Sequence, residues 1–398
     1  MSRNCWVLSG FVVLGLLFAG GCQVPGRPGK PAVEKPIIVA HYMTWFGLPE
    51  RSGAWYQWKF ALDGFPPETH HDPDFFLPDG RRDIAATHYP VIGPYDSTDP
   101  DALEYHILLA KAAGIDAFMV NWYGFEDRDG KRRHEDAGFE QLLRVAERLD
   151  FKVCVNLDDK CAFGGYRPCP TRQSAVDFAQ ATLLRVMTNY AASPAYLRIK
   201  GRPVFSNFGS MYADGKSLDQ TSFATFEWDA IIRSLAPYKP FFIHDHQWHW
   251  KKTVEQAGFL SSAASVFPWV GSKYDRDAFY DECRALHTRG KLEMIMGMAN
   301  CGFDNTPCQG WGFGIFQLPR RDGAEFREQF EESVSAGAGF IQLITWNDHT
   351  EGSSIEPTYE FGDQYLQITA EFANRFAPGS DYGTCLDLPH RIYDLRKQ

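Results

Sequence analysis

Basic residues are in deficit in this chain of 398 residues, where 40 Lys and Arg face 50 Asp and Glu and leave a formal net charge of −10. A nucleic-acid-binding domain normally shows a basic footprint, so nucleic acid is not expected as a partner. There is no CxxC pair, no EF-hand spacing and no G-x-S-x-G motif. These absences argue against a zinc site, a calcium loop of that type and a serine-hydrolase triad.

Apolar and aromatic residues are plentiful. The chain is 44% hydrophobic and 15% aromatic, with 31 Phe, 17 Tyr and 11 Trp. This composition is globular and excludes disordered, collagen-like and coiled-coil classes. The length allows one large domain or two to three ordinary ones.

The N-terminus has the pattern of a bacterial lipoprotein signal. Residues 1–22 contain a basic start, an apolar run from Val7 to Ala19, and two glycines before Cys22. We expect cleavage before Cys22 and its acylation, with an ordinary signal peptide as the alternative. Residues 23–35 are Pro- and Gly-rich and predict a tether, and 36–398 form the folded domain. The protein is thus expected to be exported and lipid-anchored at the cell envelope, with no partner protein evident.

The body alternates apolar strands with amphipathic helices. Strands are predicted at Ile37–Met43, Ile115–Asn121, Phe151–Leu157, Pro203–Asn207, Phe241–His244, Ser265–Val270, Glu293–Ala299 and Phe340–Trp346. Helices are predicted at Ala102–Ala113, Phe139–Leu149, Ser174–Ala191, Phe223–Leu235, Thr253–Ala257, Arg276–Thr288, Ala324–Ala336 and Gln364–Phe376.

Eight strands separated by helices, without a break in composition, predict a single α/β domain, a (β/α)8 TIM barrel. A long loop, 46–100, follows the first strand. A doubly wound open sheet is the alternative fold, but no glycine-rich dinucleotide fingerprint follows that strand.

In such barrels the functional site lies at the carboxyl ends of the strands. The residues there mix aromatic faces with amide, imidazole and carboxylate groups. Candidate substrate-binding residues are His41, Tyr42, Trp45, Asn121, Trp122, Tyr123, Asp158, Asn207, His244, His246, Trp269, Asn300, Trp346 and Asn347. Aromatic rings stack on sugar faces, and amides and carboxylates bind hydroxyl groups, so this set favours a carbohydrate ligand.

Cleavage of a glycosidic bond needs two carboxyl groups, one able to donate a proton. Asp348 and Glu351 are the best candidate pair. They lie three residues apart, directly after the last predicted strand, in ITWNDHTEGSSIEP. An Asp/Glu pair alone is also typical of a helix cap or a surface turn.

The segment TWNDHTEG with a downstream IEP resembles glycoside hydrolase families 71 and 99. Trp346-Asn347-Asp348 is similar to family 71, whereas Glu351-Gly352 and Ile355-Glu356-Pro357 are similar to family 99. Further matches are HYMTWFG (41–47), GPYDSTDP (93–100), GIDAFMVNWYG (114–124) and YLRIKGRPV (196–204). The resemblance covers about 37–376.

This resemblance implies a (β/α)8 barrel that hydrolyses α-linked glycans, usually internally, without a cofactor. In the family 99 pattern, Asp348 would act as base on the 2-hydroxyl of the sugar and Glu351 as acid/base. Asp348 stands where family 99 has Glu and is one methylene shorter. In a family 71-like mechanism the same pair would activate a water and invert the anomeric centre.

Two other functions stay open. The pair His244-x-His246 at a strand end, with His41 and His349, could bind a catalytic metal. A catalytically silent glycan-binding barrel is the other alternative, because a fold does not fix an activity. Separately, the short spacings predict Cys161–Cys169 and Cys301–Cys308 disulfides in an exported protein.

Overall fold

The computed structural model describes residues 35–61, 64–163, 169–209, 222–245, 262–269, 273–312 and 314–398. The signal segment with Cys22, the tether up to residue 34, His246 and the predicted helix Thr253–Ala257 lie outside the described residues.

The described strands form one large sheet and one small hairpin. They are β1 (Ile37–Met43), β2 (Ala117–Trp122), β3 (Lys152–Asp158), β4 (Arg198–Ile199), β5 (Arg202–Phe208), β6 (Phe241–Asp245), β7 (Ser265–Phe267), β8 (Met296–Asn300), β9 (Phe303–Asp304), β10 (Gln317–Leu318) and β11 (Phe340–Ile344). The large sheet has the order β7-β6-β5-β3-β2-β1-β11-β8, and every neighbouring pair in this order is parallel. All eight predicted strands are present, displaced by at most a few residues.

The two edges of this sheet approach one another. Among the described residues no ladder joins β7 to β8. However, the backbone N–H of Glu293, just before β8, donates to the carbonyl oxygen of Ala264, just before β7 (2.9 Å). The sheet is therefore a nearly closed barrel, and the predicted (β/α)8 fold is confirmed.

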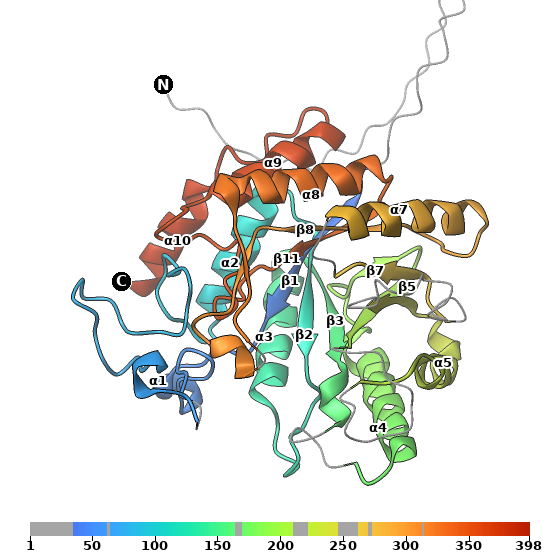
Figure 1. Ribbon diagram of the computed structural model, residues 1–398, viewed down its shortest axis with the longest axis horizontal. Helices are drawn as coiled ribbons and strands as arrows, with labels where there is room; N and C mark the ends of the chain where they lie inside the picture. The colour runs from blue at the N-terminus through green and yellow to red at the C-terminus, as the bar shows by residue number, and fades with distance from the viewer. Residues whose placement is uncertain are drawn as a thin grey trace, which may run out of the picture. The chain divides into compact units, whose positions relative to one another are not determined.

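Helices surround the strands (Figure 1). They are α1 (Pro49–Ser52), α2 (Pro100–Ala112), α3 (His134–Arg148), α4 (Arg172–Arg185), α5 (Thr225–Ser234), α7 (Lys273–Thr288), α8 (Ala324–Ser335), α9 (Gln364–Phe376) and α10 (Asp387–Lys397). Helices α1 and α10 are not among those predicted from the sequence.

Local sequence signals set the ends of these helices. Asp99 caps α2 by accepting a hydrogen bond from the backbone N–H of Asp101 (3.1 Å), and Pro100 occupies the first helical position. After α2, Gly114 has φ +77°, and a Cβ there would lie 2.5 Å from Ala373. Only glycine can occupy this position at the end of α2, after which the chain continues into β2.

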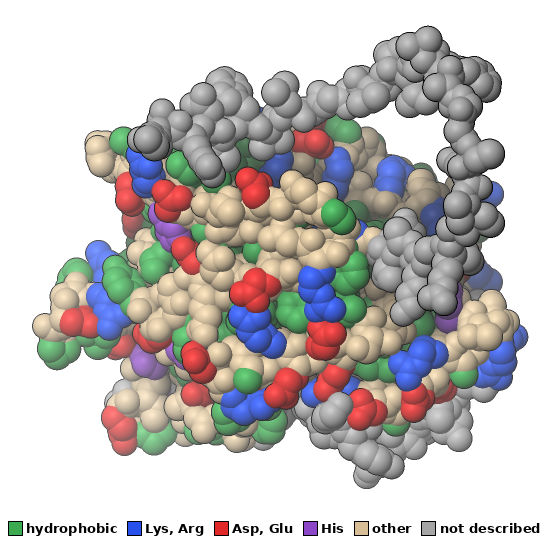
Figure 2. Space-filling view, turned by 90° about the horizontal axis from the view of Figure 1, so that it is seen from above, with side chains coloured by type: hydrophobic (Ala, Val, Ile, Leu, Met, Phe, Trp, Pro, Cys, Tyr) green, Lys and Arg blue, Asp and Glu red, His purple; other side chains and the backbone are tan. Residues whose placement is uncertain are grey.

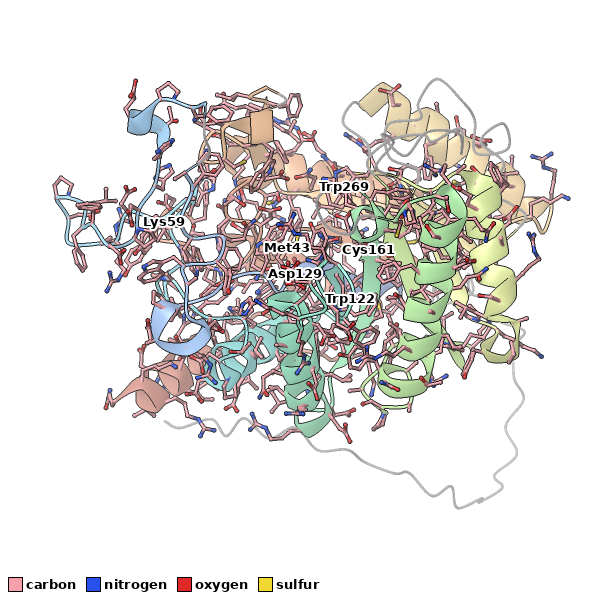
Figure 3. All side chains as sticks on the ribbon, turned by 90° about the horizontal axis from the view of Figure 1, so that it is seen from below. Met43, Lys59, Trp122, Asp129, Cys161 and Trp269 are labelled. Carbon is pink, nitrogen blue, oxygen red and sulfur yellow. The ribbon has the colours of Figure 1, made fainter. Side chains whose placement is uncertain are left out.

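The loop between β1 and α2 has a small core of its own. Phe46 and Trp58 stack at 4.1 Å, and the Trp58 indole N–H donates to the carbonyl oxygen of Tyr95 (2.8 Å). In Figure 3, Lys59 of this loop lies apart from Met43 and Trp269, which lie near the strand ends. The backbone N–H of Thr87 in this loop donates to the carbonyl oxygen of His349 (2.9 Å), so the loop contacts the segment that follows β11.

The surface carries both signs of charge. On the face seen in Figure 2, acidic and basic side chains are interspersed and form no large patch of one sign. Between α8 and α9, Arg375 forms an ion pair with Glu331 (2.5 Å). None of the described helices is both long enough and apolar enough to cross a membrane.

Candidate active site

The segment after β11, residues 345–357, carries the acidic pair. Asp348 is buried, and its Oδ1 accepts hydrogen bonds from Thr350 Oγ1 (3.0 Å) and from the backbone N–H of Glu351 (3.1 Å). Glu351 is partly exposed, and its Oε1 accepts a hydrogen bond from Trp311 Nε1 (2.8 Å). Within the described ranges, Asp348 Oδ2 and Glu351 Oε2 have no hydrogen-bond partner. These two oxygens are available to a ligand.

Both carboxyl groups have raised pKa values. For Asp348, burial and then the charge of Glu351 raise the pKa well above its usual range. For Glu351, burial raises the pKa, while the hydrogen bond from Trp311 and the charge of Lys160 lower it in part. A carboxyl pair in which one group keeps a proton suits acid–base cleavage of a glycosidic bond.

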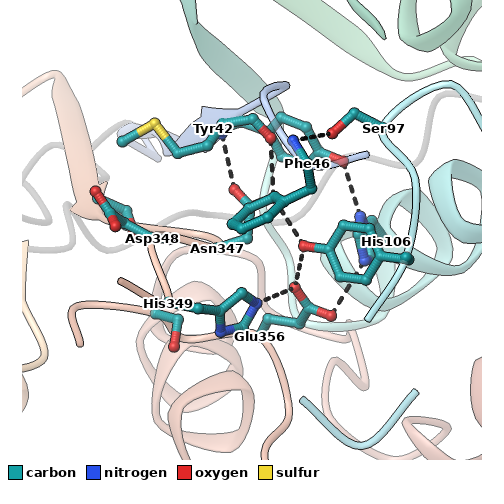
Figure 4. A network of polar contacts seen from close by, with 12 residues as sticks. Tyr42, Phe46, Ser97, His106, Asn347, Asp348, His349 and Glu356 are labelled. Carbon is teal, nitrogen blue, oxygen red and sulfur yellow. Dashed lines mark hydrogen bonds and ion pairs between the residues drawn. The ribbon is translucent and has the colours of Figure 1, made fainter. Parts of the chain in front are cut away.

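A buried polar network centred on Glu356 lies beside the segment that carries Asp348 (Figure 4). Glu356 Oε2 accepts a hydrogen bond from Tyr95 Oη (2.8 Å) and lies 3.1 Å from His349 Nε2. Its Oε1 lies 3.2 Å from His106 Nε2, and Tyr42 Oη lies 2.8 Å from His106 Nδ1. Because His349 stands between Asp348 and Thr350, this network fixes the segment that carries the acidic pair.

Glu356 is the charged centre of the network. Burial raises its pKa, but the charges and hydrogen bonds of His106 and His349 lower it more, to about 2. Glu356 is therefore ionised at neutral pH. A buried carboxylate of this kind is tolerated because its neighbours hydrogen-bond to both oxygens.

Asn347 joins the same segment to β1. Its Oδ1 accepts a hydrogen bond from the backbone N–H of Met43 (2.7 Å), and its Nδ2 donates to Met43 O (3.0 Å) and Tyr95 Oη (2.9 Å). These contacts use both of its amide N–H groups. The substrate-binding role predicted for Asn347 therefore has no support in its contacts, which make it a structural link.

Polar side chains from β2 and β3 meet near the acidic pair. Asn121 Nδ2 donates to Tyr123 Oη (3.1 Å), and both side chains lower the pKa of Asp158, which burial raises overall. The charge of Lys160 also lowers the pKa values of Asp158 and of Glu351. The charge of Lys160 therefore acts on a carboxyl group at the end of β3 and on one in the segment after β11.

His41 contributes an aromatic group inside the barrel. Its ring meets that of Trp269 edge-on, with centroids 5.4 Å apart, and its Nδ1 lies 2.9 Å from Gln342 Nε2. Burial lowers the pKa of His41 to about 3, so the ring is neutral. His41 and Trp269 therefore lie together, as expected for residues at the barrel end.

Several predicted site residues face the surrounding helices. Trp122 packs edge-on against Phe125 (4.8 Å between centroids), and Trp346 packs against Phe118 (5.0 Å). Both tryptophans are fully buried. Successive strand residues alternate between faces, and these two point into the core, so their contacts give no support to the substrate-binding roles predicted for them.

Tyr42 and His244 also face the helices. The Tyr42 hydroxyl contacts His106 of α2 (2.8 Å), and the His244 ring lies edge-on to Trp228 of α5 (6.3 Å between centroids). These described contacts are with buried residues of the protein. The substrate-binding roles predicted for Tyr42 and His244 have no support in this placement.

The other candidates shape the strand ends. Asn207 Oδ1 accepts a hydrogen bond from the backbone N–H of Asp245 (3.0 Å), and Asn300 Oδ1 accepts one from that of Gly302 (2.9 Å). Trp45 is half-buried and lies edge-on to Phe46. The described residues contain no group of three or more His, Cys, Asp or Glu side chains that could hold a metal ion.

The predicted disulfides are not formed. Cys301 and Cys308 are free thiols that donate to different carbonyl oxygens, of Ser353 (2.9 Å) and Asn305 (3.4 Å). Cys161 is a buried free thiol, so the Cys161–Cys169 bond is also absent. Short spacing brings two cysteines close in sequence, but it does not orient their Cβ atoms for a bond.

Sequence reasoning missed several residues that contact the acidic pair or support it: Lys160, Trp311, Tyr95, His106 and Glu356. Glu356 belongs to the IEP motif, which is part of the family resemblance but did not indicate a role for this residue. For Trp311, the one sequence feature that could have drawn attention to it is the glycine-rich stretch QGWGFG (309–314). The others come from helices or loops far away in sequence, which only the fold brings together.

Comparison with known proteins agrees with this geometry. Residues 34–369 match the model of glycosyl hydrolase family 99. A mouse glycoprotein endo-alpha-1,2-mannosidase-like protein is 34% identical over 375 residues, covering 85% of this chain and 76% of the relative. The corresponding zebrafish protein is 31% identical over 364 residues, covering 84% and 77%.

A solved structure shares the fold. The GH99 endo-alpha-mannosidase from Bacteroides thetaiotaomicron has a TM-score of 0.60 at 20% identity and covers 87% of this chain and 98% of that one. At this identity the likeness supports the barrel alone. The family model spans most of the domain, including both carboxyl groups of the acidic pair. The chain therefore belongs to glycosyl hydrolase family 99 and is a glycoside hydrolase.

Proposed function

We propose that this glycoside hydrolase cleaves α-linked mannans internally, with Asp348 and Glu351 as the reacting carboxyl groups. The observation that carries the proposal is the acidic pair directly after β11, where one oxygen of each carboxyl has no hydrogen-bond partner among the described residues. The names of the mouse and zebrafish relatives, endo-alpha-1,2-mannosidase-like proteins, support the substrate class and the internal cleavage.

The environments of the two groups suggest different roles. Burial and the charge of Glu351 raise the pKa of Asp348, but the hydrogen bonds that its Oδ1 accepts from the backbone of Glu351 and from Thr350 lower it in part and stabilise the ionised form that a base needs. Glu351 is the more exposed of the two and suits proton transfer to a leaving group. Asp348 would accept the proton of the sugar 2-hydroxyl or of a water, and Glu351 would protonate the glycosidic oxygen.

Burial raises both pKa values, so the directions of the pKa changes do not by themselves distinguish acid from base. We assign Asp348 as the base and Glu351 as the acid because, in the family 99 motif, the first carboxylate is the base and the second is the acid/base. Both the 2-hydroxyl and the inverting mechanism use the same two residues, so a variant of either residue tests the pair and not the stereochemistry.

A glycan panel tests the proposed function. The protein is incubated with α-1,2-, α-1,3- and α-1,6-linked mannans, with α-1,3-glucan and with a β-mannan. The masses of the released sugars are measured by mass spectrometry. We expect oligosaccharide fragments from an α-mannan, because an internal cut leaves sugars on both sides of the bond. The β-mannan is the matched control and should stay intact.

Release of monosaccharide alone would contradict internal cleavage. Products from the glucan alone would contradict the substrate class. Saturable binding of an α-mannan without any product would instead support a glycan-binding barrel. Activity that a chelator abolishes would support the metal-dependent alternative.

We further propose that the protein is exported and anchored through a lipid on Cys22. The support is the sequence pattern of residues 1–22. Cys22→Ser should move the protein from the membrane fraction to the soluble fraction or stop its maturation, as seen by immunoblotting of fractionated cells. Unchanged membrane association and molecular mass would contradict the lipid anchor.

A further inference from the structure

The turn between β9 and β10 brings a tryptophan to the acidic pair. Trp311 Nε1 donates a hydrogen bond to Glu351 Oε1 (2.8 Å), although the two residues lie 40 positions apart. The indole is 36% exposed and lies edge-on to Phe60, with centroids 5.9 Å apart. One edge of the ring therefore reaches the carboxyl while part of the ring stays open to solvent.

The backbone of this turn holds the indole in place. Gln309, Gly310 and Trp311 all have positive φ, at 50°, 59° and 53°. Such a conformation is unfavourable for Gln and Trp and persists only where surrounding contacts impose it. Asn305 supplies two of these contacts: its carbonyl oxygen accepts from Gly310 N (2.9 Å), and its Oδ1 accepts from Phe316 N (2.7 Å).

Few titratable groups face the Glu351 carboxyl, and one of them, the buried thiol of Cys308, is uncharged. Asp348 faces it from the same segment, Lys160 from the turn after β3, and Cys308 from the turn that carries Trp311. The Asp348 charge and the Lys160 charge act in opposite directions. Trp311 is the group that donates a hydrogen bond directly to this carboxyl, and such a donor favours the ionised form.

We propose that Trp311 is a positioning residue of the reaction: its indole N–H orients the Glu351 carboxyl and sets the pH at which that group gives up its proton. This inference rests on the proposed function, in which Glu351 is the acid. It assigns Trp311 a role through Glu351 that is separate from any stacking of the ring on a sugar.

A reciprocal pair of variants tests the inference. Trp311→Phe keeps an aromatic ring and removes the N–H, whereas Trp311→Gln keeps an N–H donor and removes the ring. The quantity measured is the pH dependence of kcat/KM on the α-mannan that the wild-type protein cleaves. An acid must hold its proton, so activity falls as pH rises through its pKa.

Loss of the indole N–H donor raises the pKa of Glu351. In Trp311→Phe, the high-pH limb of the kcat/KM profile, where activity falls, should therefore move to higher pH by about one unit. In Trp311→Gln the limb should stay near its wild-type position, even if KM rises through lost stacking. Phe60→Leu is the control, because it removes the ring that supports Trp311 and leaves the donor.

A limb that stays in place in Trp311→Phe, or moves equally in all three variants, would overturn the inference. The proposed function fails separately. It is contradicted if the wild-type protein cleaves no α-mannan or if Glu351→Gln stays fully active. An active wild type, an inactive Glu351→Gln and an unmoved limb in Trp311→Phe contradict the role of Trp311 alone.

Discussion

Glu351→Gln is expected to lower kcat/KM on an α-mannan by about 10²- to 10⁴-fold, the contribution typical of a general acid. Gln has the same shape as Glu and keeps an oxygen that can accept the Trp311 hydrogen bond, which is 2.8 Å long in the wild type. What it lacks is a transferable proton. The assay is the initial rate of fragment release, followed by mass spectrometry or reducing-end detection.

Glu360→Gln is the matched control. Glu360 lies nine residues further along the same stretch of chain, is exposed, and accepts one hydrogen bond from the backbone N–H of Tyr89 (3.1 Å). It should keep wild-type activity. Both variants should melt near the wild-type temperature. Full activity in a folded Glu351→Gln protein would contradict the proposed acid.

Glu356→Leu is expected to destabilise the fold by about 3–5 kcal/mol, the usual effect of breaking a buried charged contact. The change leaves the hydroxyl of Tyr95 and the Nε2 atoms of His106 and His349 without their acceptor in a fully buried site. The measurement is the free energy of unfolding from urea denaturation. Glu360→Leu should change that free energy by no more than about 0.5 kcal/mol.

The acid profile of stability tests the same network. The folded-state pKa of Glu356 is about 2, below the unfolded value of about 4.3. A depressed carboxyl pKa contributes stability above the unfolded pKa, and this contribution disappears as pH falls from about 4.3 towards 2. Its size is about 3 kcal/mol. Glu356→Gln should lose this part of the acid dependence, and an unchanged profile would argue against an ionised Glu356.

The sequence predicts the barrel well because its signals are local and repeated. Continuous apolar runs such as Ala117–Val120 require burial on both faces, and helix stops such as Gly114 require a left-handed residue. These features depend on neighbours in sequence. The terminal helix α10 was missed because its apolar face is narrow and Pro389 is the one buried residue described in it.

The site is predicted less completely because it depends on orientation. The strand-end rule selects Asn121 and Trp122 together, yet one contacts Tyr123 near the acidic pair and the other packs in the core. A shift of one residue along a strand reverses the face, and sequence does not fix that register at a strand end. Trp311 and Glu356 contact the segment that carries the acidic pair through residues far apart in sequence, and a local sequence pattern does not predict such contacts.

The central claim is that Asp348 and Glu351 act together on the glycosidic bond, and a substrate with an activated leaving group tests it most directly. Dinitrophenolate leaves a sugar without protonation, so a 2,4-dinitrophenyl α-mannobioside bypasses the acid and still requires the base. We predict that Glu351→Gln releases dinitrophenolate in its first turnover at close to the wild-type rate, whereas Asp348→Asn releases almost none. Slow first-turnover release by Glu351→Gln together with fast release by Asp348→Asn would contradict the account.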